Sequence, residues 1–374
     1  MLTRRELVRS ALSVGVLGLA TDVLSGCDAE TLRQLQETTP GWFASILAPV
    51  FYGWQEFGAK DGAPTDLRVW YPSLDGTPQG ARVAIAGHFP LVLFIHGQCA
   101  GVMNQYQTWF VLPAQLARSG YVVAVPDLGP QPPAPWEDAN ALTSAMNTLQ
   151  WMRSAWPIRH VLAPGTAVVG HSYGALLGAK IVANGDPGYA VPSPTPTVPP
   201  GPATPAFSAF AGLAGEWDNW AGVEQLPSLT TPTLLVFGDD DIFAPFTNGM
   251  WDRISPTTPK YRLKFKNAGH WDMWRTSGSS TLACDGAGAG PCNLTGGLVS
   301  DFTTIFVSKY VPPPAAGVKP GSIGNDLALS PPVRSSEQQL YVGAYLSSIP
   351  RLAVDPQCGA TLESPLMSAP KTTF

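Results

Sequence analysis

The chain has little charge for its length and no stripe of basic residues. Asp, Glu, Lys and Arg make up 13% of the 374 residues, and the formal net charge is −5. Proteins that bind nucleic acids need clustered Lys and Arg to neutralise phosphates, so this composition argues against a nucleic-acid partner. The hydrophobic content of 45% suits one sizeable α/β domain with additions rather than two full domains.

Cysteine and histidine are also scarce, with five of each. No Cys/His spacing typical of a zinc site occurs, so the sequence implies no metal, and no motif calls for a cofactor. Cys284 and Cys292 flank a Gly-rich heptapeptide, and we expect a disulfide that closes this loop; two free thiols are the alternative. The sequence leaves the pairing of Cys99 and Cys358 open.

The apolar run near the N-terminus, from Ala11 to Ala20, is too short to cross a bilayer as a helix. It follows Thr3-Arg4-Arg5-Glu6-Leu7-Val8-Arg9, which resembles a twin-arginine export motif. It precedes Leu24-Ser25-Gly26-Cys27, which resembles a bacterial lipobox. We therefore expect residues 1–26 to be a signal peptide and Cys27 to be acylated, which would anchor the protein to a bacterial membrane on its periplasmic or cell-surface side. A cleaved signal that happens to end near a cysteine is the alternative.

The most informative motif is the pentapeptide Gly170-His171-Ser172-Tyr173-Gly174, which lies between an apolar run and a helix-like stretch. A strand, a G-x-S-x-G turn and a helix form the arrangement that exposes a nucleophilic serine. The turn is so sharp that glycines are needed two residues before and two residues after the serine. The pattern predicts that Ser172 is a nucleophile; a structural serine on a Gly-rich turn is the alternative.

Two later segments supply partners for this serine. A buried-strand pattern ends in three acids, Asp239, Asp240 and Asp241, and a short strand-like run leads to His270. A serine must lose its proton as it attacks, so a base has to lie within hydrogen-bond reach, and His270 is the best candidate. The chain order Ser, Asp, His is that of the α/β hydrolases, in which the acid orients the histidine.

An oxyanion hole is expected beside the serine. The apolar run from Pro90 to Ile95 ends in His96-Gly97 and is followed by Gln98. Backbone N–H groups of Gln98 and Tyr173 are the predicted donors, because such donors stabilise the tetrahedral intermediate of acyl transfer. His96 and His171 are interpreted as residues that pack or hydrogen-bond within these motifs.

These segments together resemble the α/β-hydrolase superfamily from about Asp66 to Tyr310. Within it, two further segments resemble the platelet-activating-factor acetylhydrolase, cutinase-like polyesterase and dienelactone hydrolase groups: 66–73 and 116–127. The resemblance implies Ser172 as nucleophile, His270 as general base and then acid, and Asp241 as orienting carboxylate. The family pattern Gly-x-x-Asp-x-x-x-Pro fits Asp241 rather than its two acidic neighbours.

The predicted fold is α/β, with a mostly parallel central sheet and helices on both faces, because strands alternate with helices along the chain. We expect residues 27–65 to form a tether and lead-in, residues 66–310 the catalytic domain with a Pro-rich surface insertion at 185–205, and residues 311–374 a Pro/Ser-rich extension. Four tryptophans are predicted to line the substrate pocket or, as the alternative, to cover the edge of the core: Trp109, Trp217, Trp220 and Trp271.

We predict an exported serine hydrolase that cleaves small-molecule or lipid carboxylic esters through an acyl-enzyme on Ser172. Two other readings are kept open. An acyltransferase or a peptidase of the same fold would use the same acyl-enzyme, and a non-catalytic binding lipoprotein would use none. The ordered Ser, Asp and His argue against the binding protein, because binding alone does not require them.

Overall fold

The computed structural model describes residues 52–73, 89–97, 105–107, 111–128, 138–184, 207–217, 228–273, 295–312, 360–363 and 371–373. These residues build one ten-stranded sheet with the order β1-β2-β4-β3-β5-β6-β7-β8-β9-β10. The strands are β1 (Tyr52–Phe57), β2 (Leu67–Pro72), β3 (Phe89–Ile95), β4 (Val122–Pro126), β5 (Leu162–His171), β6 (Ala209–Leu213), β7 (Thr233–Gly238), β8 (Lys260–Phe265), β9 (Ala360–Glu363) and β10 (Lys371–Thr373).

The six central strands, from β4 through β3 and β5 to β8, run parallel to one another. Antiparallel strands complete the sheet at both sides. The predicted α/β fold with a mostly parallel sheet is therefore confirmed. In such a sheet, functional groups gather beyond the carboxyl ends of the parallel strands.

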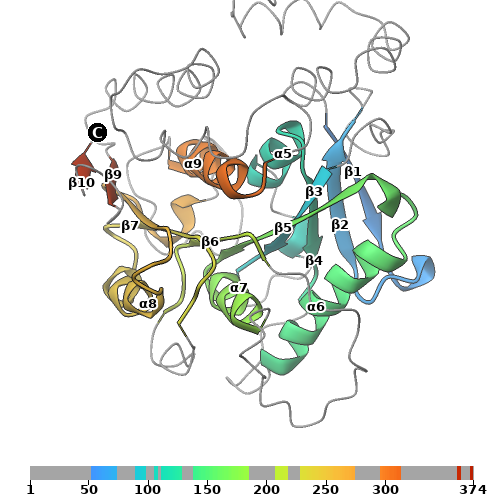
Figure 1. Cartoon of the computed structure of the whole chain (residues 1–374), viewed down its shortest axis with the longest axis horizontal. Helices are drawn as coiled ribbons and strands as arrows, with labels where there is room; N and C mark the ends of the chain where they lie inside the picture. The colour runs from blue at the N-terminus through green and yellow to red at the C-terminus, as the bar shows by residue number, and fades with distance from the viewer. Residues whose placement is uncertain are drawn as a thin grey trace, which may run out of the picture.

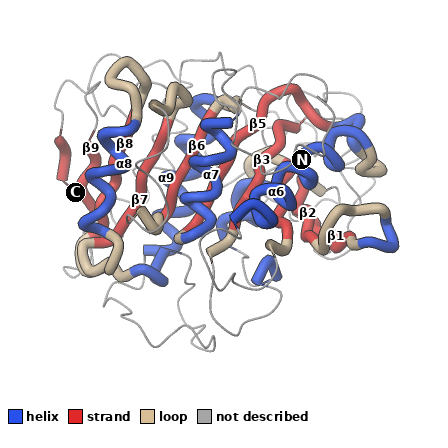
Figure 2. The backbone as a smooth tube through the Cα atoms, turned by 90° about the horizontal axis from the view of Figure 1, so that it is seen from below, coloured by secondary structure: helices blue, strands red, loops and turns tan. Residues whose placement is uncertain are grey.

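Helices cover both faces of the sheet (Figures 1 and 2). Helices α5 (Val111–Arg118) and α9 (Thr295–Tyr310) lie on one face, and α6 (Asp138–Ser154), α7 (Tyr173–Asn184) and α8 (Thr247–Arg253) lie on the other. Short 3-10 helices complete the connections: η1 (Ala59–Asp61), η2 (Gln105–Gln107), η4 (Arg159–Val161), η7 (Ala244–Phe246) and η8 (His270–Met273). In the described part of the chain, no helix is long and apolar enough to span a bilayer.

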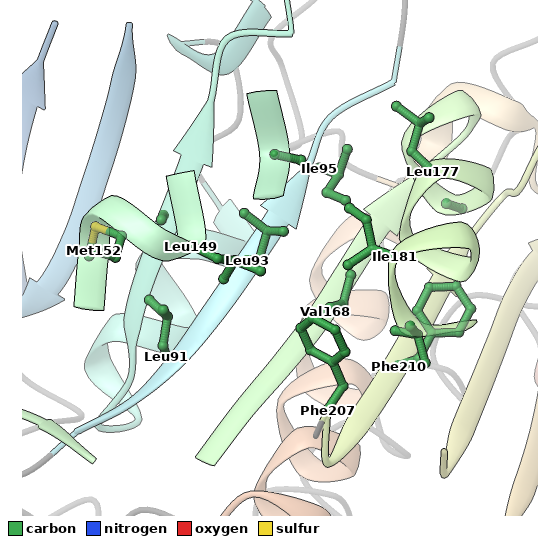
Figure 3. Close-up of a cluster of buried hydrophobic side chains, with 14 of the residues drawn as sticks. Leu91, Leu93, Ile95, Leu149, Met152, Val168, Leu177, Ile181, Phe207 and Phe210 are labelled. Atoms are coloured by element: carbon green, nitrogen blue, oxygen red, sulfur yellow. The ribbon is translucent and has the colours of Figure 1, made fainter. Parts of the chain in front are cut away.

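Each face of the sheet has its own core, because alternate side chains of a strand point to opposite faces. In β3, Leu91 and Leu93 belong to the cluster beneath α6 and α7, whereas Val92 and Phe94 belong to the cluster beneath α5 and α9. Figure 3 shows the first cluster, in which Met152 and Leu149 of α6 lie near Leu91 and Leu93 of β3. Both faces are buried, which explains why these strands are apolar without alternation.

The sheet extends beyond the predicted catalytic domain of residues 66–310 at both ends. Strand β1 falls within the predicted tether 27–65, and β9 and β10 fall within the predicted extension 311–374. Strand β9 pairs with β8, with Ala360 opposite Phe265. A four-residue strand that follows a Pro/Ser-rich stretch has too short a pattern to be read as a strand from the sequence. The predicted signal peptide and the Pro-rich insertion lie outside the described residues.

Candidate active site

The turn that carries Ser172 connects β5 to α7. Ser172 adopts a φ of 55°, which lies in the left-handed region that non-glycine residues rarely occupy. A side chain on Gly170 would overlap the backbone of Gly174, and one on Gly174 would overlap the carbonyl oxygens at the end of β3. The Ser172 N–H donates to the Leu213 carbonyl of β6 at 2.9 Å. The strained conformation is thus held by neighbouring strands, as expected of a functional turn.

The loop that carries His270 follows β8 and packs against the acidic turn after β7. Asn267 has a φ of 52°, and a side chain on Gly238 would overlap the Ala268 carbonyl. The Asp240 N–H donates to that carbonyl at 3.1 Å. The Gly269 N–H donates to Asp272 Oδ2 at 2.7 Å. These contacts fix the backbone immediately before the histidine.

Ser172, His270 and Asp241 form one hydrogen-bonded chain. Ser172 Oγ lies 2.8 Å from His270 Nε2, and His270 Nδ1 lies 3.0 Å from Asp241 Oδ1. All three residues are buried, with 4%, 5% and 3% of their surface exposed. The three residues come from the carboxyl ends of β5, β8 and β7, which the parallel sheet brings together. An imidazole placed in this way can take the serine proton while the carboxylate holds its other nitrogen.

The structure distinguishes the three consecutive acids. Asp239 and Asp240 are exposed, and their backbone N–H groups donate to the Phe265 and Ala268 carbonyls. Asp241 alone among the three points into the site, where Oδ1 accepts both the His270 ring proton and the Phe243 N–H at 2.9 Å. The carboxylate next to the imidazole is therefore Asp241.

Of the two predicted oxyanion-hole donors, the structure describes Tyr173. Tyr173 is the first residue of α7, where the helix dipole favours a negative charge. The end of β3 lies directly against the serine turn, because a Cβ built on Gly97 would lie 2.8 Å from Ser172 Cβ. Gln98, the second predicted donor, lies outside the described residues, as do Trp109, Trp220, Cys27, Cys284 and Cys292.

The two remaining predicted pocket residues differ in placement. Trp217 is 4% exposed and packs onto Gly212 and Gly215 in the core beside the serine turn. Trp271 is partly exposed, and its ring lies edge-on to His270 with 4.8 Å between the centroids. Trp271 thus borders the site, whereas the pocket role of Trp217 stays a prediction.

Three further residues contact the site; the sequence assigns no role to Phe243 or Asp272 and indicates for His171 only packing or hydrogen bonding within the serine motif. Phe243 packs edge-on against the His270 ring at 5.0 Å, and Asp272 fixes Gly269. His171 Nε2 lies 3.1 Å from the His270 carbonyl oxygen, to which it donates. The signals in the sequence were that all three stand within two residues of a predicted triad member and that His171 lies inside the serine motif. In the described ranges, no group of three or more His, Cys, Asp or Glu side chains could hold a metal ion.

Because two histidines are buried, we expect the free energy of unfolding to decrease at acidic pH. Burial lowers the pKa of His96 and lowers that of His171 well below its usual value. The nearby His270 also lowers the pKa of His171. The unfolded chain takes up protons at both as the pH falls through about 6.5, whereas the folded chain does so only at lower pH. The free energy of unfolding should therefore fall below that pH, by up to about 1.4 kcal/mol per pH unit for each histidine.

Urea unfolding between pH 7 and 5 measures this dependence. His171→Gln should reduce its slope by close to one proton relative to the wild type. Equal slopes in the wild type and His171→Gln would contradict the assignment of this proton uptake to His171.

The model of the alpha/beta hydrolase family matches residues 92–286, just over half of the chain, and this range contains Ser172, Asp241 and His270. No curated protein matches the chain with significant similarity.

Proposed function

The chain belongs to the alpha/beta hydrolase family and is a hydrolase of that fold, and we propose that it cleaves carboxylic esters through an acyl-enzyme on Ser172. The observation that carries the proposal is the hydrogen-bonded chain from Ser172 through His270 to Asp241. A serine, a histidine and a carboxylate in contact in this order are the parts that acyl transfer needs.

In the proposed acylation step, Ser172 Oγ attacks the ester carbonyl carbon as His270 Nε2 takes its proton. The tetrahedral intermediate collapses when the imidazolium returns that proton to the leaving alcohol. Water then attacks the acyl-enzyme as His270 Nε2 takes a proton from it. The imidazolium returns this proton to Ser172 Oγ as the acyl C–O bond breaks, which frees the serine and releases the carboxylic acid. Asp241 stabilises the imidazolium in both acylation and deacylation. Its carboxylate lies 3.0 Å from the ring and is buried, so little solvent screens the attraction between the two charges.

The oxyanion that forms in each half needs N–H donors, and we assign this role to Tyr173 and Gln98. The position of Tyr173 at the start of α7 and the close contact of Gly97 with the serine turn support the assignment. Loss of one such donor typically lowers kcat about 10²- to 10³-fold.

The proposal is tested with p-nitrophenyl esters from acetate to palmitate and with a fluorophosphonate that labels activated serines. We expect ester hydrolysis, and a phosphonate adduct that peptide mapping assigns to Ser172. Ser172→Ala should show neither. The chain length with the highest kcat/KM reports the depth of the acyl site. Wild-type protein that hydrolyses no ester and takes up no phosphonate would refute the proposal, whereas product that goes to an added alcohol in preference to water would identify an acyltransferase.

We also propose that the protein is exported and held on a membrane by an acyl chain on Cys27. The twin-arginine-like start and the lipobox-like sequence before Cys27 support this. Expressed in a bacterium fed an alkyne fatty acid, the wild type should carry the label and sediment with membranes. Cys27→Ser should lose the label, with Cys99→Ser as the matched control. Labelling that persists in Cys27→Ser would contradict the anchor site.

A further inference from the structure

The backbone of three consecutive residues in the His270 loop, 268–270, is anchored by hydrogen bonds. The Ala268 carbonyl accepts from the turn after β7, and the Gly269 N–H donates to Asp272 within the loop. The His270 carbonyl accepts from His171 Nε2 at 3.1 Å. This third bond connects the loop that bears the proposed base to the strand that bears the proposed nucleophile.

His171 and Ser172, adjacent at the end of β5, thus contact different parts of His270. Ser172 Oγ contacts the ring at Nε2, and His171 contacts the main chain. The distance between serine and imidazole depends on where the His270 backbone lies relative to β5. The His171 bond fixes that position directly, over a shorter path than the connection through β6, β7 and β8.

The His171 ring is enclosed and has little freedom to turn. It is fully buried, and its centroid lies 5.1 Å from that of His270 and 5.7 Å from that of Trp271. On the side of β3, a Cβ built on Gly97 would lie 2.7 Å from Nδ1. The enclosure fixes which nitrogen faces the His270 carbonyl. Because Nε2 donates to this carbonyl, it carries the proton, and Nδ1 is the unprotonated nitrogen of the neutral ring.

We propose that His171 is a positioning residue, whose neutral imidazole, protonated at Nε2, holds the His270 backbone at the distance that proton transfer from Ser172 requires. The inference rests on the proposed function, because it concerns the same reaction. Displacing a reacting group by about 1 Å can lower a rate about 10²-fold. A hydrogen bond that fixes the base can therefore have a large effect on kcat although His171 does not touch the substrate.

The neutral state of His171 is part of this role. The titratable groups that act on it are His270, which packs against it, and His96 at the end of β3. Burial, followed by the charges of these two histidines, lowers the pKa of His171 well below its usual value. During catalysis His270 becomes a cation, and a second cation in contact with it would oppose that step. A neutral donor positions the loop without this repulsion.

The test compares His171→Leu, which removes the donor, with His171→Gln, whose amide can donate at a similar reach. His160→Leu, at an exposed histidine, is the matched control. With a p-nitrophenyl ester, we expect His171→Leu to lower kcat about ten- to hundredfold with KM within about twofold. His171→Gln should recover kcat to within about threefold of the wild type. A Leu variant within twofold of the wild-type kcat, or a Gln variant as slow as Leu, would overturn the proposal.

A measurement on the wild type covers the case in which His171→Leu does not fold. Long-range ¹H–¹⁵N spectra of the imidazoles should show His171 protonated at Nε2 and not at Nδ1 at neutral pH. A proton on Nδ1 would overturn the proposal. Failure of the proposed function is seen separately, either as a wild type that hydrolyses no ester and takes up no phosphonate or as ester hydrolysis that survives in Ser172→Ala. Neither result changes the tautomer measurement.

Discussion

Replacement of Ser172 by Ala, of His270 by Ala, or of both together should lower kcat for ester hydrolysis by similar factors, roughly 10⁵- to 10⁶-fold. The two side chains are joined at 2.8 Å and act as a unit. Without the serine there is no nucleophile for the imidazole to activate, and without the imidazole the serine keeps its proton. The second substitution therefore has almost nothing left to remove.

The measurement is kcat and KM for a p-nitrophenyl ester in the two single variants and the double variant. Ser154→Ala, on the exposed side of α6, is the control and should retain wild-type kcat. KM should change little in all variants, because neither side chain is needed to bind the ester. A double variant far slower than both singles would show that the residues act independently, and a loss of less than tenfold in Ser172→Ala would refute the nucleophile.

The sequence predicted the site where steric constraints require a particular residue type or where the order of motifs along the chain identifies the partners. The two glycines around Ser172 are required by backbone contacts that the structure shows, so the motif carries its own conformation. The choice of Asp241 among three acids followed from a family pattern. In the structure, Gly238 packs against the Ala268 carbonyl, and Asp241 is the acid that reaches His270. This contact between two distant turns cannot be read from the local sequence.

The roles of Trp217 and His171 could not be predicted from the sequence. Trp217 could line a pocket or cover the edge of the core, and its residue type fits both. Its burial and its packing onto Gly212 and Gly215 are known only from the structure, and its pocket role stays a prediction. His171 stands inside the serine motif at a position where the family pattern allows any residue. Its hydrogen bond spans 99 residues of sequence, and a contact that distant leaves no local pattern to read.

The edges of the sheet were missed for a different reason. Strand β1 contains Tyr52, Trp54 and Phe57, an alternation interrupted by polar residues, and its register against β2 is set by long-range pairing. Strands β9 and β10 have four and three residues. Pairing of β9 with β8 places residues 360–363 beside the strand that leads to His270. Short edge strands depend on the sheet they join, so their own sequences specify them weakly.

Asp241→Asn should lower kcat about 10³- to 10⁴-fold while leaving the protein folded. The amide oxygen can still accept the Phe243 N–H that Asp241 Oδ1 accepts at 2.9 Å, so the turn keeps its bond. What is lost is the negative charge beside His270, and the side chain of Asp241 is fully buried, so solvent cannot replace that charge. The imidazolium formed as Ser172 attacks then has no counter-charge.

Asp240→Asn is the matched control, because it makes the same chemical change one residue away on an exposed side chain, and it should keep kcat within about twofold. Thermal unfolding of both variants separates lost chemistry from lost structure. If Asp240→Asn were the slower enzyme, the orienting carboxylate would be Asp240. If both variants retained full kcat, neither Asp240 nor Asp241 would act on His270, and the role of Asp241 as the third catalytic member would be refuted.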